Sequence, residues 1–395
     1  MIVKPRIRGF ICTTAHPKGC AAHVALQIAA VLRSGRIANG PKRVLVIGSS
    51  GGYGLASRIV ATFACGADTL GVSFEKQPEG DRTATAGWYN NHAFEAAARR
   101  AGRFAETFDG DAFSDAMKAR VIERIKSSLG QIDLVVYSVA SPVRQHPKTG
   151  QLHRSVIKPL GESLRVRTLN VDKGEVVETD LTPATDEETA ATVAVMGGED
   201  WELWINALET AGVLARGFQT VNFAYIGSEL TWPIYWRATL GRAKEDLDRA
   251  AGAIRGRLAS LGGDARVAVL KAVVTQASTA IPVVPLYVSL LFKVMKQQRV
   301  HEDLIDHVYR LFATQLYGGQ PRRLDESGRI RLDDVELSER VQTEVKRRWP
   351  IVTSANLAEL ADLEGFRADF LKIFGFGIAG VDYNEDLDTT IGYDA

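Results

Sequence analysis

The sequence predicts an α/β fold in which a doubly wound parallel sheet is covered by helices on both faces. From Lys42 onward, continuous apolar stretches alternate with stretches of helical spacing, which is typical of buried parallel strands joined by helices. The first apolar stretch ends in a glycine-rich turn, and the first helical stretch follows at once. This order of strand, glycine-rich turn and helix indicates a Rossmann-type nucleotide-binding sheet.

The alternating part of the chain is expected to form six strands with a crossover segment between each pair. The predicted strands are 42–48, 68–75, 103–111, 132–140, 219–227 and 265–275. The predicted helices are 54–66, 90–102, 113–130, 199–214 and about 238–260, and their crossovers should be right-handed. Gly66 is suited to end the first helix, and the Ser114 hydroxyl is suited to cap the third.

Residues 141–198 interrupt the alternation at the carboxyl end of the fourth strand. Within them SLRVRTLNVDKGEVVETDL predicts a hairpin that turns at Lys173 and Gly174. Because open α/β sheets bind ligands beyond the carboxyl ends of their strands, we expect this insertion to form a lid on the substrate side. The segment 281–395 is expected to be a helical extension that ends in a loose acidic tail, VDYNEDLDTT. The expected organisation is one large domain, 1–395, whose nucleotide-binding core is formed by 42–140 and 199–280.

Composition and charge argue against several classes of protein. The 395 residues are 46% hydrophobic and 24% charged with a formal net charge of +1, so no nucleic-acid partner is expected. The N-terminus lacks the apolar stretch of a signal peptide. The longest apolar run, AIPVVPLYVSLLF, has about 13 residues, fewer than the ~20 that cross a bilayer. Three cysteines without a C-x-x-C spacing fit a reducing compartment, and we expect a cytoplasmic protein without membrane insertion.

Four residues near the N-terminus are spaced somewhat like metal ligands: Cys12, His16, Cys20 and His23. They lack the paired C-x-x-C knuckles of zinc sites and precede the first strand of the alternation. Ordinary packing is therefore favoured, and no metal is expected.

The turn after the first strand has the spacing of a phosphate-binding loop. VLVIGSSGGYGLASR places Gly48, Gly52 and Gly54 between a strand and a helix. Glycines allow a tight turn and close backbone approach, and the helix N-terminus offers free N–H groups to a pyrophosphate. The alternative is a tight turn without a ligand. The residues expected to contact a dinucleotide here are Gly48, Ser49, Ser50, Gly51, Gly52 and Tyr53.

The ends of the next strands carry further candidate cofactor residues. Glu75 closes the second strand, where a carboxylate can accept hydrogen bonds from both ribose hydroxyls and would repel a 2′-phosphate. This favours NADH over NADPH, although Lys76 beside it weakens the repulsion, and a solvated glutamate is the alternative. The topology also places one pair of residues near the adenine, Asp111 and Ala112, and one near the adenosine ribose, Val139 and Ala140.

IYWRATLGRAK contains a tyrosine and a lysine in the window where short-chain reductases carry their catalytic pair. Tyr235 and Lys244 are nine positions apart, and the common tyrosine-x-x-x-lysine does not occur in the chain. The same spacing recurs at Tyr287 and Lys296, which we interpret as a coincidence because it follows the sixth strand. Residues nine apart on one helix point to opposite sides at ~100° per residue. We therefore predict that Tyr235 lies on a turn set by Pro233 and that only Lys244 lies in the helix.

Two other segments are candidates for contacts at the reacting end of the ligands. Tyr225 ends the fifth strand, where it could contact substrate or nicotinamide, or be an ordinary half-buried aromatic residue. Thr275 follows the sixth strand and is placed to bond the carboxamide of the cofactor. The apolar helix after Ala280 could cover an acyl chain.

The chain resembles the bacterial NADH-dependent trans-2-enoyl reductases of the FabV/TER type. The resemblance rests on stretches spread over almost the whole chain, among them KPRIRGFICTTAHPKGC, GPKRVLVIGSSGGYGLASRI, YSVASPVRQHPKTG, IYWRATLGRAK and FGFGIAGVDYNED. It implies reduction of the double bond of 2-enoyl thioesters carried by acyl carrier protein or coenzyme A, in fatty acid synthesis, by a monomer.

The resemblance also implies roles for single residues. Tyr235 would be the proton donor to the enolate, Lys244 a cofactor ligand and Tyr225 a substrate contact. The implied NADH contacts are the loop Gly48–Tyr53, Phe74 and Glu75, Asp111 and Ala112, Val139 and Ala140, and Val273, Val274 and Thr275.

Two other functions remain open on the residues alone. A carbonyl reductase would use the same fold, but the missing tyrosine-x-x-x-lysine speaks against it. A nucleotide-binding redox sensor would need neither Tyr235 nor Lys244.

Overall fold

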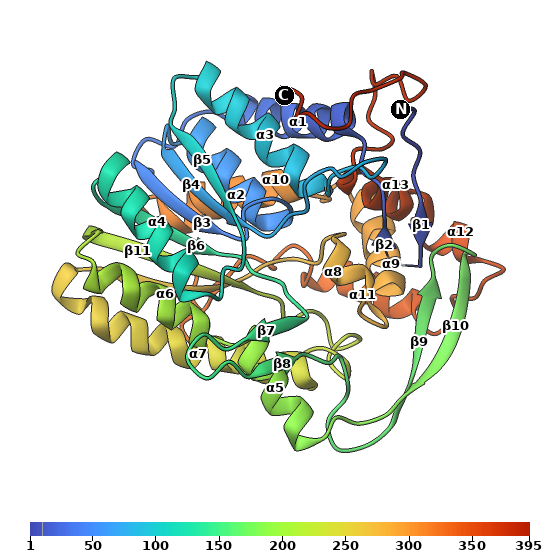
Figure 1. The fold of residues 1–395 in the computed structure, drawn as a ribbon. Coiled ribbons are helices and arrows are strands. Elements are labelled where there is room, and N and C mark those ends of the chain that lie inside the picture. The colour runs from blue at the N-terminus through green and yellow to red at the C-terminus, as the bar shows by residue number, and fades with distance from the viewer. Residues whose placement is uncertain (10) are drawn as a thin grey trace.

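The computed structural model describes residues 1–9 and 11–395. Its centre is a seven-stranded sheet in which every pair of neighbouring strands is parallel (Figure 1). In spatial order the strands are β13 (Ile330–Arg331), β12 (Asp264–Val269), β11 (Leu214–Ala224), β6 (Ile132–Tyr137), β3 (Arg43–Ile47), β4 (Asp68–Ser73) and β5 (Ala105–Asp109). The first strand of this sheet along the chain is β3, in its interior. The next strands, β4 and β5, are added on one side of β3, and β6 and all later strands are added on the other side. The predicted doubly wound parallel sheet is confirmed.

Helices cover both faces of the sheet, as Figure 1 shows. On one face lie α1 (Pro17–Ser34), α2 (Gly52–Phe63), α3 (Ala86–Arg100) and α10 (Leu304–Arg310), and on the other α4 (Asp115–Ser128), α6 (Glu199–Thr210) and α7 (Thr239–Leu258). Strand β3 contributes to both cores. Val44 and Val46 pack with the first set and Leu45 and Ile47 with the second, because successive side chains of a strand point to opposite faces.

Helix α2 ends at Phe63 with Ala64 as its C-cap, so the predicted cap at Gly66 lies two residues too late. Gly66 has φ of +72°, and its N–H donates to the Thr62 carbonyl at 3.1 Å while that of Ala67 donates to Ala61 at 2.9 Å. Glycine adopts this left-handed conformation without strain, so Gly66 can turn the chain from the helix toward β4. At α4 the Ser114 hydroxyl accepts from Met117 N at 3.1 Å, as predicted.

Several predicted boundaries are wrong, and each has a local cause. Strand β11 begins at Leu214, where we predicted the end of a helix, and its pairing with β6 shifts register before Gln219 around Gly217, whose φ is +73°. Strand β12 ends at Val269, six residues early. Leu270 N still donates to the Ala224 carbonyl of β11, but Lys271 N donates to His307 Nε2 and Ala272 N to Glu336 Oε2. Helix α1 and strand β13 carried no prediction.

The insertion contains two hairpins instead of one. β9 (Leu164–Asn170) and β10 (Glu175–Leu181) form the predicted antiparallel pair, and Gly174 in its turn has φ of +70°. A shorter pair precedes it, β7 (Val143–Gln145) and β8 (Leu152–Arg154), and α5 (Asp186–Met196) packs on α7.

The C-terminal segment adds helices beside the carboxyl edge of the sheet. Its elements are α8 (Gln276–Thr279), α9 (Val284–Gln297), α11 (Glu339–Arg348), α12 (Leu357–Leu360) and α13 (Leu363–Ile373), with a π-helical turn, Leu311–Leu316, after α10. The apolar run of the sequence is mostly α9, which is buried against α11 and α13. Within the described residues, no helix is both long and apolar enough to cross a membrane.

The acidic tail is docked, so the prediction of a loose end is wrong. Lys18 pairs with Glu385 at 2.5 Å, and Arg100 pairs with Asp394 at 2.7 Å. The Tyr89 hydroxyl donates to the Thr389 carbonyl at 2.7 Å. These partners belong to α1 and α3, and Figure 1 shows both termini on that side of the molecule, near α1. Acidic composition suggested disorder, whereas the basic partners lie far away in sequence.

Candidate active site

The phosphate loop is built around close backbone contacts that only glycine allows. A Cβ on Gly54 would lie 1.8 Å from the Gly48 carbonyl oxygen, and one on Gly48, whose φ is +85°, would lie 2.2 Å from the Ser138 oxygen. These contacts hold the start of α2 against the ends of β3 and β6. Gly51, by contrast, is extended and has no atom within 4 Å of an added Cβ. The free N–H groups at the start of α2 therefore face open space, as a pyrophosphate site requires.

The side chains of the phosphate loop differ in their contacts. The Ser50 hydroxyl donates to Glu75 Oε1 at 2.5 Å. Ser49 is fully buried, and within the described chain its hydroxyl oxygen has no hydrogen-bond partner. The Tyr53 hydroxyl donates to the Lys271 carbonyl at 2.7 Å, so its side chain turns away from the loop. A cofactor contact from Tyr53 would have to come from its main chain.

Glu75 is held in place from two sides. In addition to Ser50, the Thr85 hydroxyl donates to its other oxygen, and a Cβ on Gly87 would lie 2.1 Å from Oε1. Burial raises the pKa of Glu75 above its ordinary value, and the two hydroxyl donors counteract this rise. Phe74 beside it is 81% exposed, which leaves its ring free for a ligand. The arrangement fits a carboxylate that accepts from ribose hydroxyls.

This geometry makes cofactor choice testable at Glu75. We expect Glu75→Ala to tighten NADPH binding about tenfold or more and to weaken NADH binding, because a negative charge facing the 2′-phosphate is removed. Dissociation constants from the fluorescence of each cofactor measure the effect. The matched control is Glu79→Ala, at an exposed glutamate four positions on. An unchanged preference for NADH in Glu75→Ala would contradict the role of Glu75.

The other predicted cofactor residues lie in loops just beyond the strands. Asp111 Oδ1 accepts from Phe113 N at 2.9 Å, and the Ala112 carbonyl accepts from the Trp204 indole at 3.0 Å. Val139 is half-buried and Ala140 is exposed. The strands β3, β4, β5 and β6 all end at this one edge of the sheet, so the loops share a single side (Figure 1).

The segment Val273–Thr275 lies next to the phosphate loop. The nearest atom to a Cβ placed on Gly52 is Thr275 Cγ2, at 3.8 Å. Thr275 caps α8 in a reciprocal arrangement, in which its hydroxyl accepts from Ser278 N at 3.1 Å and its N–H donates to Ser278 Oγ at 2.9 Å. Two stretches more than 200 positions apart in sequence thus meet at one place.

Tyr235 and Lys244 adopt the arrangement that their spacing predicts. Helix α7 begins at Thr239, so Lys244 lies inside it, while Tyr235 lies on the preceding turn, where its N–H donates to the Thr231 carbonyl at 2.9 Å. The Tyr235 side chain is 9% exposed, and its hydroxyl makes no hydrogen bond to any described residue. Burial raises its pKa above the ordinary value, so the hydroxyl keeps its proton at neutral pH.

Lys244 is half-buried, and its ammonium group donates to the Phe223 carbonyl at 3.3 Å. Burial lowers its pKa to about 8, partly offset by Asp248. A lysine with this pKa is still largely charged at neutral pH and has donor capacity left for a ligand.

Tyr225 lies beside Tyr235, and sequence reasoning missed what fixes it there. The two rings meet edge to face, with centroids 5.0 Å apart and planes at 86°. The Tyr225 hydroxyl donates to Glu336 Oε1 at 3.0 Å, and so does that of Tyr287, at 2.8 Å. Lys296, the other member of the second tyrosine–lysine pair, bonds to Asp362 instead, at 2.6 Å. No motif in the sequence indicates Glu336.

Residues 82–317 match the family profile described as the trans-2-enoyl-CoA reductase catalytic region, and residues 2–80 match the NAD(P)H binding domain of trans-2-enoyl-CoA reductase. The chain belongs to the trans-2-enoyl-CoA reductase family. The resemblance noted in the sequence is thereby confirmed, since the first of these profiles alone covers more than half of the chain.

Individual proteins similar to this chain are also named as enoyl reductases. The chain is 57% identical over 394 residues to the NADH-dependent enoyl-[acyl-carrier-protein] reductase FabV of Aeromonas salmonicida, covering 100% of this chain and 99% of that protein. It is 55% identical, with the same coverage, to the corresponding reductase of Tolumonas auensis. The crystal structure of Treponema denticola trans-2-enoyl-CoA reductase in complex with NAD matches with a TM-score of 0.94 and 47% identity, over 98% of each chain.

A third profile, described as an enoyl reductase FAD binding domain, matches residues 324–387 of the reductase. The residues do not fit a flavin. The one glycine-rich pattern in this segment, Gly375-x-Gly377-x-x-Gly380, follows helix α13 rather than a strand, and no helix begins after it. Gly375 instead packs against α1, because a Cβ on Gly19 would lie 1.7 Å from its carbonyl oxygen. Gly375 therefore serves to pack the tail against α1.

Proposed function

We propose that this protein reduces the carbon–carbon double bond of a trans-2-enoyl thioester, with Tyr235 as donor to the developing enolate oxygen and Lys244 as a ligand of the cofactor. Membership of the reductase family supports the reaction and the use of NADH. NADH supplies the hydride when bound. The observation that carries the residue roles is the position of Tyr235 on a turn next to the helix that holds Lys244, with a hydroxyl that bonds none of the described residues.

Tyr235 can act where negative charge develops. When the double bond is reduced at its β-carbon, charge accumulates on the thioester oxygen. A neutral hydroxyl that already lacks a partner can donate to that oxygen without first breaking another bond. One such donor in a site shielded from water contributes roughly 3–4 kcal/mol to transition-state stabilisation.

The simplest test measures the loss of NADH absorbance after crotonyl-coenzyme A is added. We expect turnover with this substrate and none with acetoacetyl-coenzyme A, a 3-ketoacyl thioester that a carbonyl reductase would reduce. Turnover of the ketone alone would overturn the proposal in favour of a carbonyl reductase. Binding of NADH without turnover of either substrate would favour a redox sensor.

Lys244 makes NADH affinity dependent on pH. Its pKa of about 8 lies below the ordinary lysine value, so in the cofactor-free protein its charge is present at pH 7 and lost as the pH rises through 8. We expect the dissociation constant for NADH to rise between pH 7 and pH 9, by up to about tenfold, because a charged donor at the ribose is lost. Lys244→Arg stays charged over this range and should bind with a flat profile. An equally steep profile in that variant would contradict the role of Lys244.

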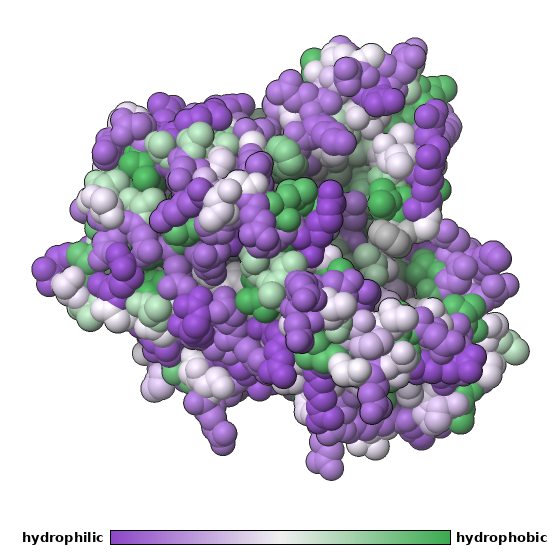
Figure 2. Space-filling model, turned by 60° about the horizontal axis from the view of Figure 1, so that its bottom comes forward, coloured by the Kyte–Doolittle hydropathy of each residue, from purple (hydrophilic) through white to green (hydrophobic). Residues whose placement is uncertain are grey.

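The carrier of the acyl chain is proposed to be acyl carrier protein or coenzyme A, since relatives are named for both. We further propose a cytoplasmic monomer. On the face shown in Figure 2 most residues are hydrophilic, and hydrophobic ones gather in a hollow or are separated by polar neighbours. This face offers no broad apolar area to a permanent partner, and light scattering after gel filtration measures the mass directly.

A further inference from the structure

We propose that Glu336 is a positioning residue that binds the hydroxyl proton of Tyr225, so that Tyr225 faces the substrate only as an acceptor and Tyr235 is the sole phenolic donor. This inference rests on the proposed function, because it concerns which of two neighbouring tyrosines donates to the enolate oxygen. It assigns a role to a residue of the C-terminal segment that lies outside the nucleotide-binding core.

Three groups donate to the Glu336 side chain. Oε1 accepts from the hydroxyls of Tyr225 and Tyr287, at 3.0 and 2.8 Å, and Oε2 accepts from Ala272 N at 2.6 Å. Glu336 is fully buried. Burial raises the pKa of Glu336 above its ordinary value, and the three hydrogen bonds offset only part of this rise. In its ionised form the Glu336 side chain can only accept, so every one of these hydrogen bonds then takes its proton from the partner.

The direction of the Tyr225 bond follows from this donor count. A tyrosine hydroxyl has one proton, and here it points at Glu336. Because its one proton is used in this bond, the Tyr225 oxygen can only accept a further hydrogen bond, through its lone pairs. Tyr287 obeys the same rule, because its oxygen accepts from the Gln342 amide at 3.0 Å while its proton also goes to Glu336. Tyr235, whose ring touches that of Tyr225, keeps its proton free.

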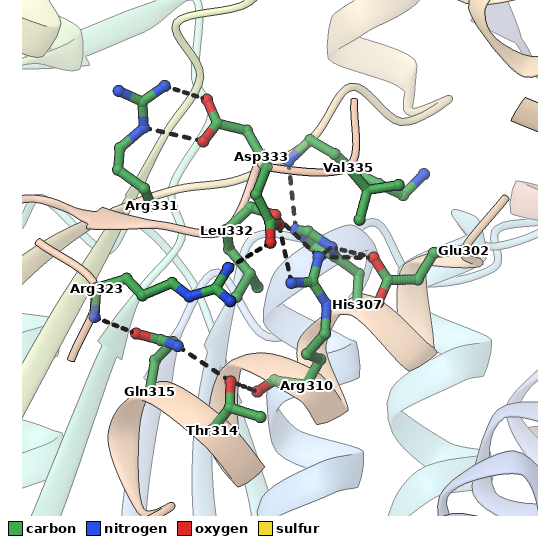
Figure 3. A network of polar contacts seen from close by, with 12 residues as sticks. Glu302, His307, Arg310, Thr314, Gln315, Arg323, Arg331, Leu332, Asp333 and Val335 are labelled. Atoms are coloured by element: carbon green, nitrogen blue, oxygen red, sulfur yellow. Dashed lines mark hydrogen bonds and ion pairs between the residues drawn. The ribbon is translucent and has the colours of Figure 1, made fainter. Parts of the chain in front are cut away.

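The segment that carries Glu336 is itself held by hydrogen bonds to the sheet and to Arg310. Leu332 N donates to the Val269 carbonyl at 3.0 Å as the segment leaves the sheet edge. Arg310 then donates to the Leu332 carbonyl and to Asp334, both at 3.0 Å, and it is held by Glu302 at 2.7 Å. Figure 3 shows this arginine lying between Glu302 and the main chain of the segment. Glu336 therefore sits on a rigid base, as a positioning group must.

Glu336 also links the substrate tyrosine to the cofactor segment. Glu336 accepts a hydrogen bond from Ala272 N, just after strand β12 has ended. The residues that follow Ala272 are the predicted cofactor contacts Val273–Thr275. One carboxylate thus fixes the substrate side and the cofactor side of the site relative to each other.

The decisive experiment compares the effect of Tyr235→Phe on kcat in the wild type and in Glu336→Gln, with NADH and crotonyl-coenzyme A. In the glutamine variant, the amide oxygen faces Ala272 N and the amide N–H groups face the two tyrosines, so the Tyr225 proton is released toward the substrate. Tyr225 can then replace Tyr235 in part. We expect Tyr235→Phe to lower kcat at least tenfold less in the glutamine background than in the wild type. Adding Tyr225→Phe should abolish this difference.

An equal loss of kcat in both backgrounds would overturn the proposal while leaving Tyr235 as donor. If Tyr235→Phe lowered kcat in neither background, the proposed role of Tyr235 would be overturned. The assignment of Tyr235 as donor and Tyr225 as acceptor would fall with it. The matched control is Asp333→Asn, which changes a buried carboxylate on the same segment whose side chain pairs with Arg331. It should lower the melting temperature without changing the response to Tyr235→Phe.

A second test does not depend on the folding of Glu336→Gln. Because Tyr225 is an acceptor only, Tyr225→Phe in the wild type removes no donor to the enolate. We expect it to raise KM for the thioester while kcat falls less than tenfold. A loss of kcat as large as that of Tyr235→Phe would overturn the proposal.

Discussion

Tyr235→Phe is expected to lower kcat by roughly 100- to 1000-fold, the cost of removing one preorganised donor to a developing oxyanion. The change removes a single oxygen that no other described residue bonds, so the protein should keep its stability. The NADH dissociation constant should also stay within about twofold of the wild type, because Lys244 holds the cofactor. Steady-state kinetics with crotonyl-coenzyme A, together with NADH fluorescence titration, measures both quantities.

The control for this change is Tyr309→Phe, at a tyrosine whose hydroxyl donates to the Ser34 carbonyl away from the site. It should leave kcat unchanged. If Tyr235→Phe retained more than a third of the wild-type kcat, another group would have to donate the proton, and the account of the site would be wrong.

Gly54→Ala is expected to weaken NADH binding by at least about 100-fold, because backbone atoms block the added methyl group. Its Cβ would lie 1.8 Å from the Gly48 carbonyl oxygen and 3.4 Å from the Ser138 Cβ. The start of α2 would have to move away from β3, and the pyrophosphate site would open. The melting temperature should fall as well, because the same packing holds the core together. Titration calorimetry with NADH and thermal unfolding measure the two effects.

Two other glycines serve as controls for Gly54. Gly256 lies within α7 with no atom within 4 Å of an added Cβ, so Gly256→Ala should be neutral or stabilise by up to about 1 kcal/mol. Gly51→Ala meets no protein atom either and should fold normally, yet its methyl group would project into the proposed phosphate site. Wild-type NADH affinity in Gly54→Ala would show that the loop is not where the cofactor binds.

The parts of the fold that the sequence could predict are those governed by local pattern. Buried parallel strands are continuous apolar runs, so composition predicts β3, β4 and β6, and the single residue Ser114 predicts the start of α4. The same reasoning placed Tyr235 outside α7, because two residues nine apart cannot share a side of one helix. Composition does not fix the strand ends, since they depend on where the neighbouring strand stops.

What the sequence could not predict depends on contacts between distant segments. Glu336 meets Tyr225 across 111 positions and Ala272 across 64, and no local pattern marks it. The acidic tail has the composition of a disordered end, and its partners Lys18 and Arg100 lie in distant segments of the chain. Strand β13, with two residues, is too short to give a periodic signal.

The central claim is that the enzyme delivers hydride to the β-carbon of an enoyl thioester, and the most direct measurement follows that hydride. The enzyme is incubated with crotonyl-coenzyme A and NADH that carries deuterium at the transferable position of the nicotinamide, and the product is examined by mass spectrometry and NMR. The account predicts butyryl-coenzyme A with one deuterium at C3 for each NADH oxidised. Deuterium at the carbonyl carbon, or oxidation of NADH without butyryl-coenzyme A, would contradict it.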